Sequence, residues 1–139
     1  MPDRVMKRLA TLSLCATLFL GACTTAGEPP RYRGALSAEG SSVSLHRPVE
    51  VGAMIVTPLV LVEDSRCPTD TTCVWQGRVV IEARVDGPGW SETTTLTLNE
   101  PTLLHGMAVV LVGAEPYPVA GGAHLPGDYR FTFASAAPA

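Results

Sequence analysis

The sequence predicts an all-β protein: a single antiparallel β-sandwich of immunoglobulin-like size, with about seven short strands. Three observations predict it. Apolar residues recur with a period of two in short runs, turn-forming residues separate these runs, and no run has the 3.6-residue period of a helix. A closed barrel of similar strand count is the alternative. The chain has 139 residues, which is enough for one domain.

Residues 1–22 have the layout of a secretory signal peptide. A basic start that includes Arg4, Lys7 and Arg8 precedes the uncharged run at residues 9–20, and small residues follow. Crossing a bilayer takes about 20 apolar residues, so this run is too short for a permanent membrane helix. We therefore expect the segment to be cleaved after export.

The segment ends in Leu20-Gly21-Ala22-Cys23, which resembles the lipobox of bacterial lipoproteins. The resemblance implies that Cys23 becomes the N-terminus and is acylated, so that membrane lipid is a partner. Two acyl chains already anchor a protein stably. The next residue is Thr24 rather than Asp, which by analogy with Gram-negative lipoproteins favours the outer membrane, facing the periplasm. An ordinary secreted protein with a free Cys23 thiol is the alternative.

Residues 23–42 are expected to form the lipidated cysteine and a flexible tether, because they are rich in Gly, Pro and Ser and poor in large apolar groups. The alternative is that Tyr32 or Leu36 docks on the domain. From Cys23 onward, 7 Arg and no Lys stand against 12 Asp and Glu. This acidic balance argues against nucleic acid as a partner.

The sandwich domain is expected at residues 43–133. Residues 43–47 predict a first strand that stops at the following proline, and residues 49–51 predict a short edge strand. Residues 54–63 are nearly all apolar and predict a strand buried on both faces. Pro58 lies inside this run and predicts a bulge or an edge position.

Two further runs, residues 78–86 and 90–99, predict an antiparallel hairpin around the turn sequence Asp-Gly-Pro-Gly. The side chains expected to face inward alternate along both runs: Val79, Ile81, Ala83, Val85, Leu96 and Leu98. Glu100-Pro101 is expected to end the second run. A further strand is expected at residues 107–112.

The final strand is expected at residues 129–133, where three aromatic side chains alternate with polar ones. Between it and the preceding strand, the sequence predicts a long irregular connection. Residues 134–139 are expected to be a disordered tail.

The four cysteines differ in context. Cys15 lies in the signal segment and Cys23 in the lipobox, which leaves Cys67 and Cys73 for a disulfide in an exported protein. Metal binding by these two thiolates is the alternative, but structural zinc sites with this kind of spacing usually have a second pair.

The loop that contains this cysteine pair is the candidate binding loop. Arg66 has Glu63, Asp64 and Asp70 within reach for an ion pair, and Trp75 is expected to leave the loop into the core and pack on the disulfide. One interpretation is a purely structural corner. The other is a loop that presents side chains to a partner, since loops on rigid scaffolds often carry function. The candidate residues are Asp64, Arg66, Thr69, Asp70 and Trp75.

The sequence Asp64-Ser65-Arg66-Cys67-Pro68, followed by Cys73-Val74-Trp75 and Gly77, resembles a motif in small bacterial exported proteins, many of them lipoproteins. In that family, the motif lies between two strands, and a strand that contains a tyrosine closes the domain, as Tyr129-Arg130-Phe131 does in this sequence. The resemblance implies the architecture. The family has no established activity, so the resemblance implies no catalytic residues.

The sequence contains neither a His-Glu-x-x-His nor a Gly-x-Ser-x-Gly motif. We therefore expect a non-enzymatic envelope lipoprotein without a cofactor, which binds an envelope protein or glycan or has a structural role. A copper- or zinc-binding lipoprotein is the alternative. Its ligands would come from scattered histidines and carboxylates: His46, His105 and His124 with Glu63, Asp64 or Asp128.

Overall fold

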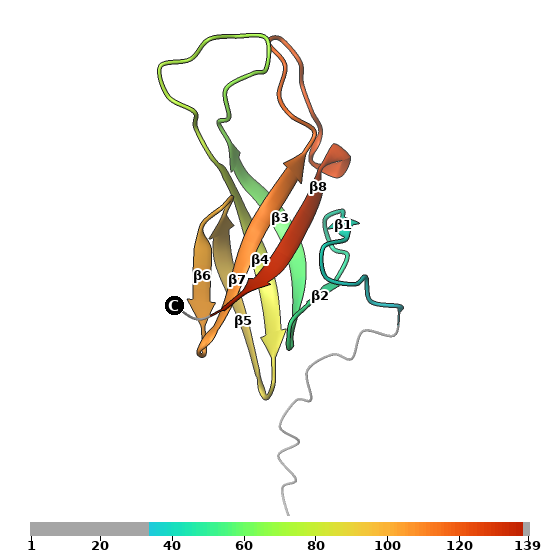
Figure 1. Ribbon diagram of the computed structural model, residues 1–139. Coiled ribbons are helices and arrows are strands. Elements are labelled where there is room, and N and C mark those ends of the chain that lie inside the picture. The colour runs from blue at the N-terminus through green and yellow to red at the C-terminus, as the bar shows by residue number, and fades with distance from the viewer. Residues whose placement is uncertain (1–33, 138–139) are drawn as a thin grey trace, which may run out of the picture.

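The structure is a computed structural model that describes residues 34–137, and two four-stranded antiparallel sheets pack there as a β-sandwich (Figure 1). This confirms the predicted fold class. The predicted signal segment and Cys23 lie outside the described residues. Among residues 34–137, no helix is long and apolar enough to cross a membrane.

One sheet has the strand order β2-β3-β4-β5 and the other has the order β1-β8-β7-β6. A short 3-10 helix, η1 (Pro126–Asp128), precedes the last strand. The strands are β1 (Ser42–Val43), β2 (Val49–Val51), β3 (Met54–Asp64), β4 (Val79–Gly87), β5 (Trp90–Thr97), β6 (Pro101–Leu104), β7 (Met107–Glu115) and β8 (Arg130–Ala136).

The core lies between the two sheets, where alternating side chains of both meet. The predicted β4–β5 hairpin is confirmed, and its inward-facing residues on β4 are fully buried. From the other sheet, Leu111, Phe131 and Phe133 are fully buried as well. Burying a side chain of this size stabilises the fold by about 1.5–3 kcal/mol.

Strand β3 has the predicted bulge at Pro58 but not the predicted burial on both faces. Pro58 pairs with Ala83 and Val60 pairs with the adjacent Glu82, so the register shifts between the two positions. Val60 and Val62 are 50% and 58% exposed. The prediction was wrong because this sheet has a second layer on one side only, so alternate apolar residues of β3 face outward.

The two shortest strands also differ from the prediction. Strand β1 ends early because the chain turns at His46, whose φ is +62° and whose amide donates to the Pro58 carbonyl (2.7 Å). Strand β6 was not expected because Pro101 lacks an amide hydrogen. It begins an edge strand of its sheet, where a missing donor is tolerated. The sandwich therefore has eight strands instead of about seven.

The end of the predicted tether packs on the sandwich, which corrects the extent of that segment. Ser37 bridges to Val49, and the Glu39 carboxylate accepts hydrogen bonds from the amide and hydroxyl of Ser135 and from the Gly52 amide. The same bonds, those from Ser135 first, lower the pKa of Glu39. Leu36 is half-buried, in line with the docking alternative. The composition of this segment predicted a flexible tether because it has few large apolar residues. Hydrogen bonds, rather than apolar burial, hold its end on the sandwich.

The predicted disordered tail is also wrong at its start, because β8 continues to Ala136. Its last residues pair with β7, Ala134 with Val110 and Ala136 with Ala108. Small residues predict little order by themselves, but here the neighbouring strand supplies the backbone partners.

Candidate functional site at the loop end

Two long loops extend together from one end of the sandwich (Figure 1). The disulfide loop, residues 65–78, connects β3 to β4, and the β7–β8 loop comprises residues 116–129. The Thr69 amide donates to the Pro118 carbonyl (3.1 Å), and the Ala120 amide donates to the Asp70 carboxylate (2.8 Å). Thr69 and Asp70, which were candidate binding residues, therefore join the two loops. We call this part of the molecule the loop end.

The predicted disulfide between Cys67 and Cys73 is confirmed, with 5.9 Å between the two Cα atoms. At the base of the loop, the Cys67 amide donates to the Gln76 carbonyl (3.0 Å) and the Ser65 amide donates to the Arg78 carbonyl (2.9 Å). Backbone pairing thus continues past the ends of β3 and β4, and the cross-link closes the segment beyond it.

Gly77 is required at the base of this loop. Its φ is +65°, and a Cβ atom there would lie 1.7 Å from the Ser65 carbonyl oxygen. Only glycine combines a positive φ with such a close approach of two backbone segments. The sequence motif contains this residue, but its role is visible only in the fold.

Arg66 is buried below the disulfide loop and is 8% exposed. Its Nε and one terminal nitrogen donate to the two oxygens of Asp64 (2.8 and 2.7 Å). The guanidinium also donates to the carbonyls of Ala114 (2.7 Å), near the end of β7, and of Pro116 (2.8 Å), at the start of the β7–β8 loop. One buried cation therefore connects β3 to the second loop.

The Tyr129 hydroxyl completes this network by donating to the Asp64 carboxylate (2.8 Å). Burial by itself raises the pKa of Asp64, but the hydrogen bonds from Arg66 and Tyr129 outweigh burial and leave this pKa below its ordinary value. The hydrogen bond to Asp64 raises the pKa of Arg66. Burial, followed by the bond to Asp64, raises the pKa of Tyr129. Asp64 and Arg66 thus brace the loops, and little of either side chain is exposed.

Trp75 is the one predicted binding residue whose large side chain lies on the surface. It is 80% exposed and the adjacent Val74 is 95% exposed, so the prediction that Trp75 enters the core was wrong. The reason is position: the disulfide loop extends beyond the ends of both sheets, where no second layer can cover it (Figure 1).

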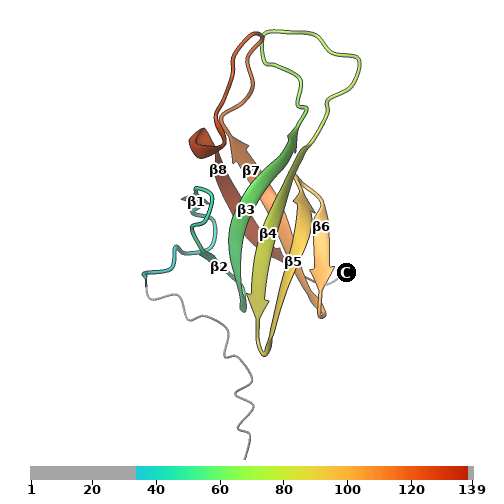
Figure 2. The same cartoon turned by 180° about the vertical axis from the view of Figure 1, so that it is seen from behind.

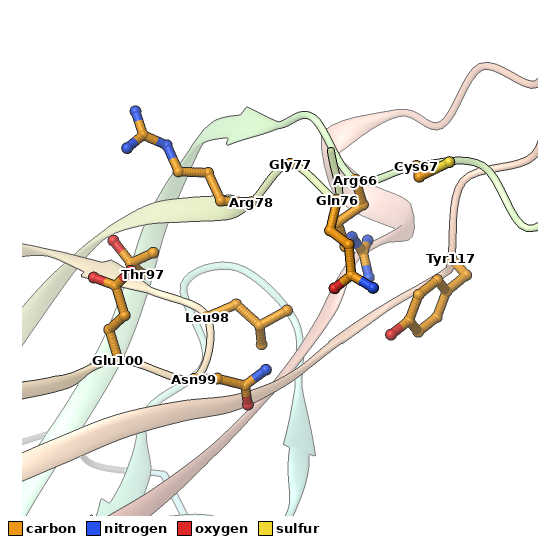
Figure 3. A pocket seen from close by; sticks show the side chains of 10 residues that line it. All are labelled: Arg66, Cys67, Gln76, Gly77, Arg78, Thr97, Leu98, Asn99, Glu100 and Tyr117. Carbon is orange, nitrogen blue, oxygen red and sulfur yellow. The ribbon is translucent and has the colours of Figure 1, made fainter. Parts of the chain in front are cut away.

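A cleft of about 350 Å³ opens at the base of the disulfide loop (Figure 3). Its walls come from this loop, from the connection after β5 and from the β7–β8 loop. The lining residues are Arg66, Cys67, Gln76, Gly77, Arg78, Thr97, Leu98, Asn99, Glu100 and Tyr117. We call it the carboxamide cleft, after Gln76 and Asn99.

Sequence reasoning missed Gln76, Asn99 and Tyr117 as candidate binding residues. A compositional signal was present, because Gln76 is the only glutamine and Asn99 the only asparagine in the whole sequence. Nothing in the sequence, however, places the two in one cleft.

The three histidines lie apart. His105 stacks on Trp90 with 4.3 Å between the ring centroids, and His124 packs edge-on against Tyr129. His46 lies in the turn after β1. Within residues 34–137, no group of three or more His, Cys, Asp or Glu side chains is placed to hold a metal ion. The metal-binding alternative therefore has no geometric support in this part of the chain.

No protein-family model, curated protein or solved structure matches this chain. The loop end combines an exposed Val74–Trp75 pair, a cleft with polar lining residues and a buried network beneath the loops.

Proposed function

We propose that this chain is a bacterial envelope lipoprotein, anchored through an acylated Cys23, and that it acts as a non-enzymatic binding module. The lipobox at residues 20–23 and the resemblance of the Cys67–Cys73 motif to exported lipoproteins support the anchor. The proposed location is the outer membrane, facing the periplasm. The proposed partner at the loop end is another envelope component.

The observation that carries the binding role is the exposure of Trp75 on a braced loop. Tryptophan is over-represented among residues that dominate binding energy at interfaces. Binding by a loop that is already ordered loses less conformational entropy than binding by a free loop. The disulfide and the Thr69 and Asp70 contacts supply this order in advance.

The orientation of the sandwich is compatible with both roles. In two opposite views, the described chain begins on the flank of the sandwich and away from the loop end (Figures 1 and 2). Cys23 precedes Gly34 by 11 residues, which span at most about 40 Å when extended. An anchored molecule can therefore present its loop end away from the lipid surface.

Cell fractionation tests the anchor. Cys23→Ser should move the protein from the membrane fraction to the soluble fraction, because the acyl chains supply the membrane affinity. A variant that stays in the membrane fraction after a high-salt wash would contradict lipidation.

Site-specific photo-crosslinking in intact cells tests the binding surface. A photoreactive phenylalanine analogue at Trp75 should give discrete cross-linked species. The matched control is the same analogue at Leu103 on β6, an apolar side chain of comparable exposure (66%). Equal cross-linking at both positions, or none at Trp75, would contradict a specific role for the loop end.

A further inference from the structure

The carboxamide cleft collects the only two carboxamide side chains of the chain, Gln76 and Asn99, although they come from different loops. We propose that this cleft is a binding site for a neutral saccharide unit of an envelope glycan. This inference rests on the proposed function, since it names the ligand class of the same loop end.

Three neutral polar groups point toward one space in the cleft. Figure 3 shows the amides of Gln76 and Asn99 and the hydroxyl of Tyr117 around the side chain of Leu98. None of these three groups forms a hydrogen bond with another residue in the described part of the chain. Each amide offers both donors and an acceptor, and a hydroxyl offers one donor and two acceptor lone pairs. This set matches neighbouring sugar hydroxyls, which also donate and accept.

The charges around the cleft favour a neutral ligand. Arg66 is paired with Asp64 (2.7 Å), and Arg78 is paired with Glu63 (2.9 Å). Glu100, on the rim, forms no salt bridge with any residue that the structure describes. Arg78 is exposed and donates to Glu63 only through its Nε, but the carboxylates of Glu63 and Glu100 outnumber this one exposed cation, so an anion finds no net positive charge at the cleft. A phosphate or carboxylate ligand is disfavoured for this reason.

Tyr117 supplies a flat apolar surface. The Arg66 guanidinium carbon lies 4.6 Å from the centroid of its ring and covers one face. Tyr117 is nevertheless 59% exposed, so Arg66 leaves much of this residue accessible. Aromatic faces carry partial negative charge, and the C–H groups along one side of a pyranose ring carry weak positive charge. A sugar can thus stack on the ring while the amides bind its hydroxyls.

The volume limits the ligand. About 350 Å³ lies at the lower end of the range for small-molecule sites. It suits one or two sugar rings, such as a chain end, rather than an extended polymer.

Backbone conformation explains one of the two carboxamides without a ligand. Asn99 has a φ of +64°, a region that asparagine tolerates better than most residues. Gln76 has no such constraint, and only its backbone carbonyl is used, by the Cys67 amide. Backbone geometry therefore accounts for Asn99 but not for Gln76.

Because the chain has one glutamine and one asparagine, NMR can follow the two side chains of the cleft directly. A ¹⁵N-labelled sample of the mature protein, extracted in a detergent without a sugar headgroup, should show only two side-chain carboxamide NH₂ signals, those of Asn99 and Gln76. The titrants are N-acetylglucosamine, N,N′-diacetylchitobiose, maltose and lactose, with glucuronic acid and tri-alanine as the anionic and peptide comparisons. At least one neutral sugar should shift both signals in a saturable way at up to about 20 mM, a range that detects millimolar binding.

Variants then test the site. Asn99→Gly keeps the positive φ and removes the amide, and should weaken binding about five- to tenfold, as read from the Gln76 signal. Thr95→Ala, on the exposed side of β5 and outside the cleft, should leave binding unchanged. The inference is overturned if no neutral sugar shifts the two signals, if only glucuronic acid or tri-alanine does, or if Asn99→Gly binds as the wild type does. Because cross-linking from Trp75 is measured separately, a failure here leaves the binding role of the loop end standing.

Discussion

The guanidinium of Arg66 lies against the carboxylate of Asp64 through two hydrogen bonds of 2.8 and 2.7 Å, and both side chains are less than 10% exposed. The two residues are only two positions apart in the sequence, but the pair also contacts segments that are far away along the chain. Through Arg66 it reaches the carbonyls of Ala114 and Pro116, and through Asp64 it reaches Tyr129. Each sheet therefore contributes to one buried polar network beneath the loop end.

Removing the cation should destabilise the whole domain. We expect Arg66→Met to lower the free energy of unfolding by about 3–5 kcal/mol, because Asp64 is left as a buried carboxylate without its partner. Urea unfolding followed by circular dichroism measures this loss. Arg78→Met is the matched control, since Arg78 forms an exposed pair with Glu63 and its loss should have a much smaller effect. Equal losses in the two variants would contradict the role of the network.

Acid should weaken the same network. The pKa of Asp64 is lower in the folded protein than its ordinary value of about 3.9, so the unfolded state binds more protons as the pH falls. The stabilisation by ionised Asp64 is complete when the pH is above the ordinary pKa of this carboxyl group. It is lost as the pH falls through the lower pKa of the folded protein. Urea unfolding between about pH 5 and pH 2 should therefore show a falling free energy of unfolding. Asp64→Asn should be less stable at pH 7 and less sensitive to acid. An unchanged pH dependence in this variant would rule out the assignment.

The disulfide should contribute mainly by closing its own loop. Replacing both cysteines with serine should lower the free energy of unfolding by about 2.4 kcal/mol on the chain-entropy model for a loop of about seven residues. The far-ultraviolet circular dichroism should change little, because the cross-link lies beyond the ends of β3 and β4. Intact-mass measurement of the wild type, purified without reductant, supplies the control. Two free thiols in that sample would refute the cross-link.

Two glycines with positive φ separate backbone strain from a steric clash. Gly77 and Gly89 have φ values of +65° and +77°, so alanine is strained at both, by roughly 1–2 kcal/mol. Only at Gly77 would the new Cβ meet the Ser65 carbonyl; nothing lies within 4 Å at Gly89. Gly77→Ala should therefore lose at least about 1 kcal/mol more than Gly89→Ala in urea unfolding. Equal losses would show that the close approach at Gly77 is unimportant.

Much of the fold could be predicted because it depends on local pattern. Alternation along β4 placed Val79, Ile81, Ala83 and Val85 inward, and each is fully buried. The prolines were less uniform guides. Pro58 marked a real bulge, and the predicted break at Glu100-Pro101 is present because β5 ends at Thr97, but Pro101 also begins an edge strand that was not expected. Whether a missing amide hydrogen matters depends on which neighbour the strand has, and this is a property of the sheet.

The sequence by itself determined the inward face of β4 and the cysteine pair, because each depends on residues close together in the chain. Only the tertiary structure decided which polar side chains are buried and which are presented. Arg66 is buried where β7 and the start of the β7–β8 loop each bring it a carbonyl, and Trp75 is exposed because its loop extends beyond both sheets. Gln76, Asn99 and Tyr117 form one cleft because three connections meet at the same end of the sandwich. The period of the apolar residues along the chain does not show which connections lie together at one end of the sandwich.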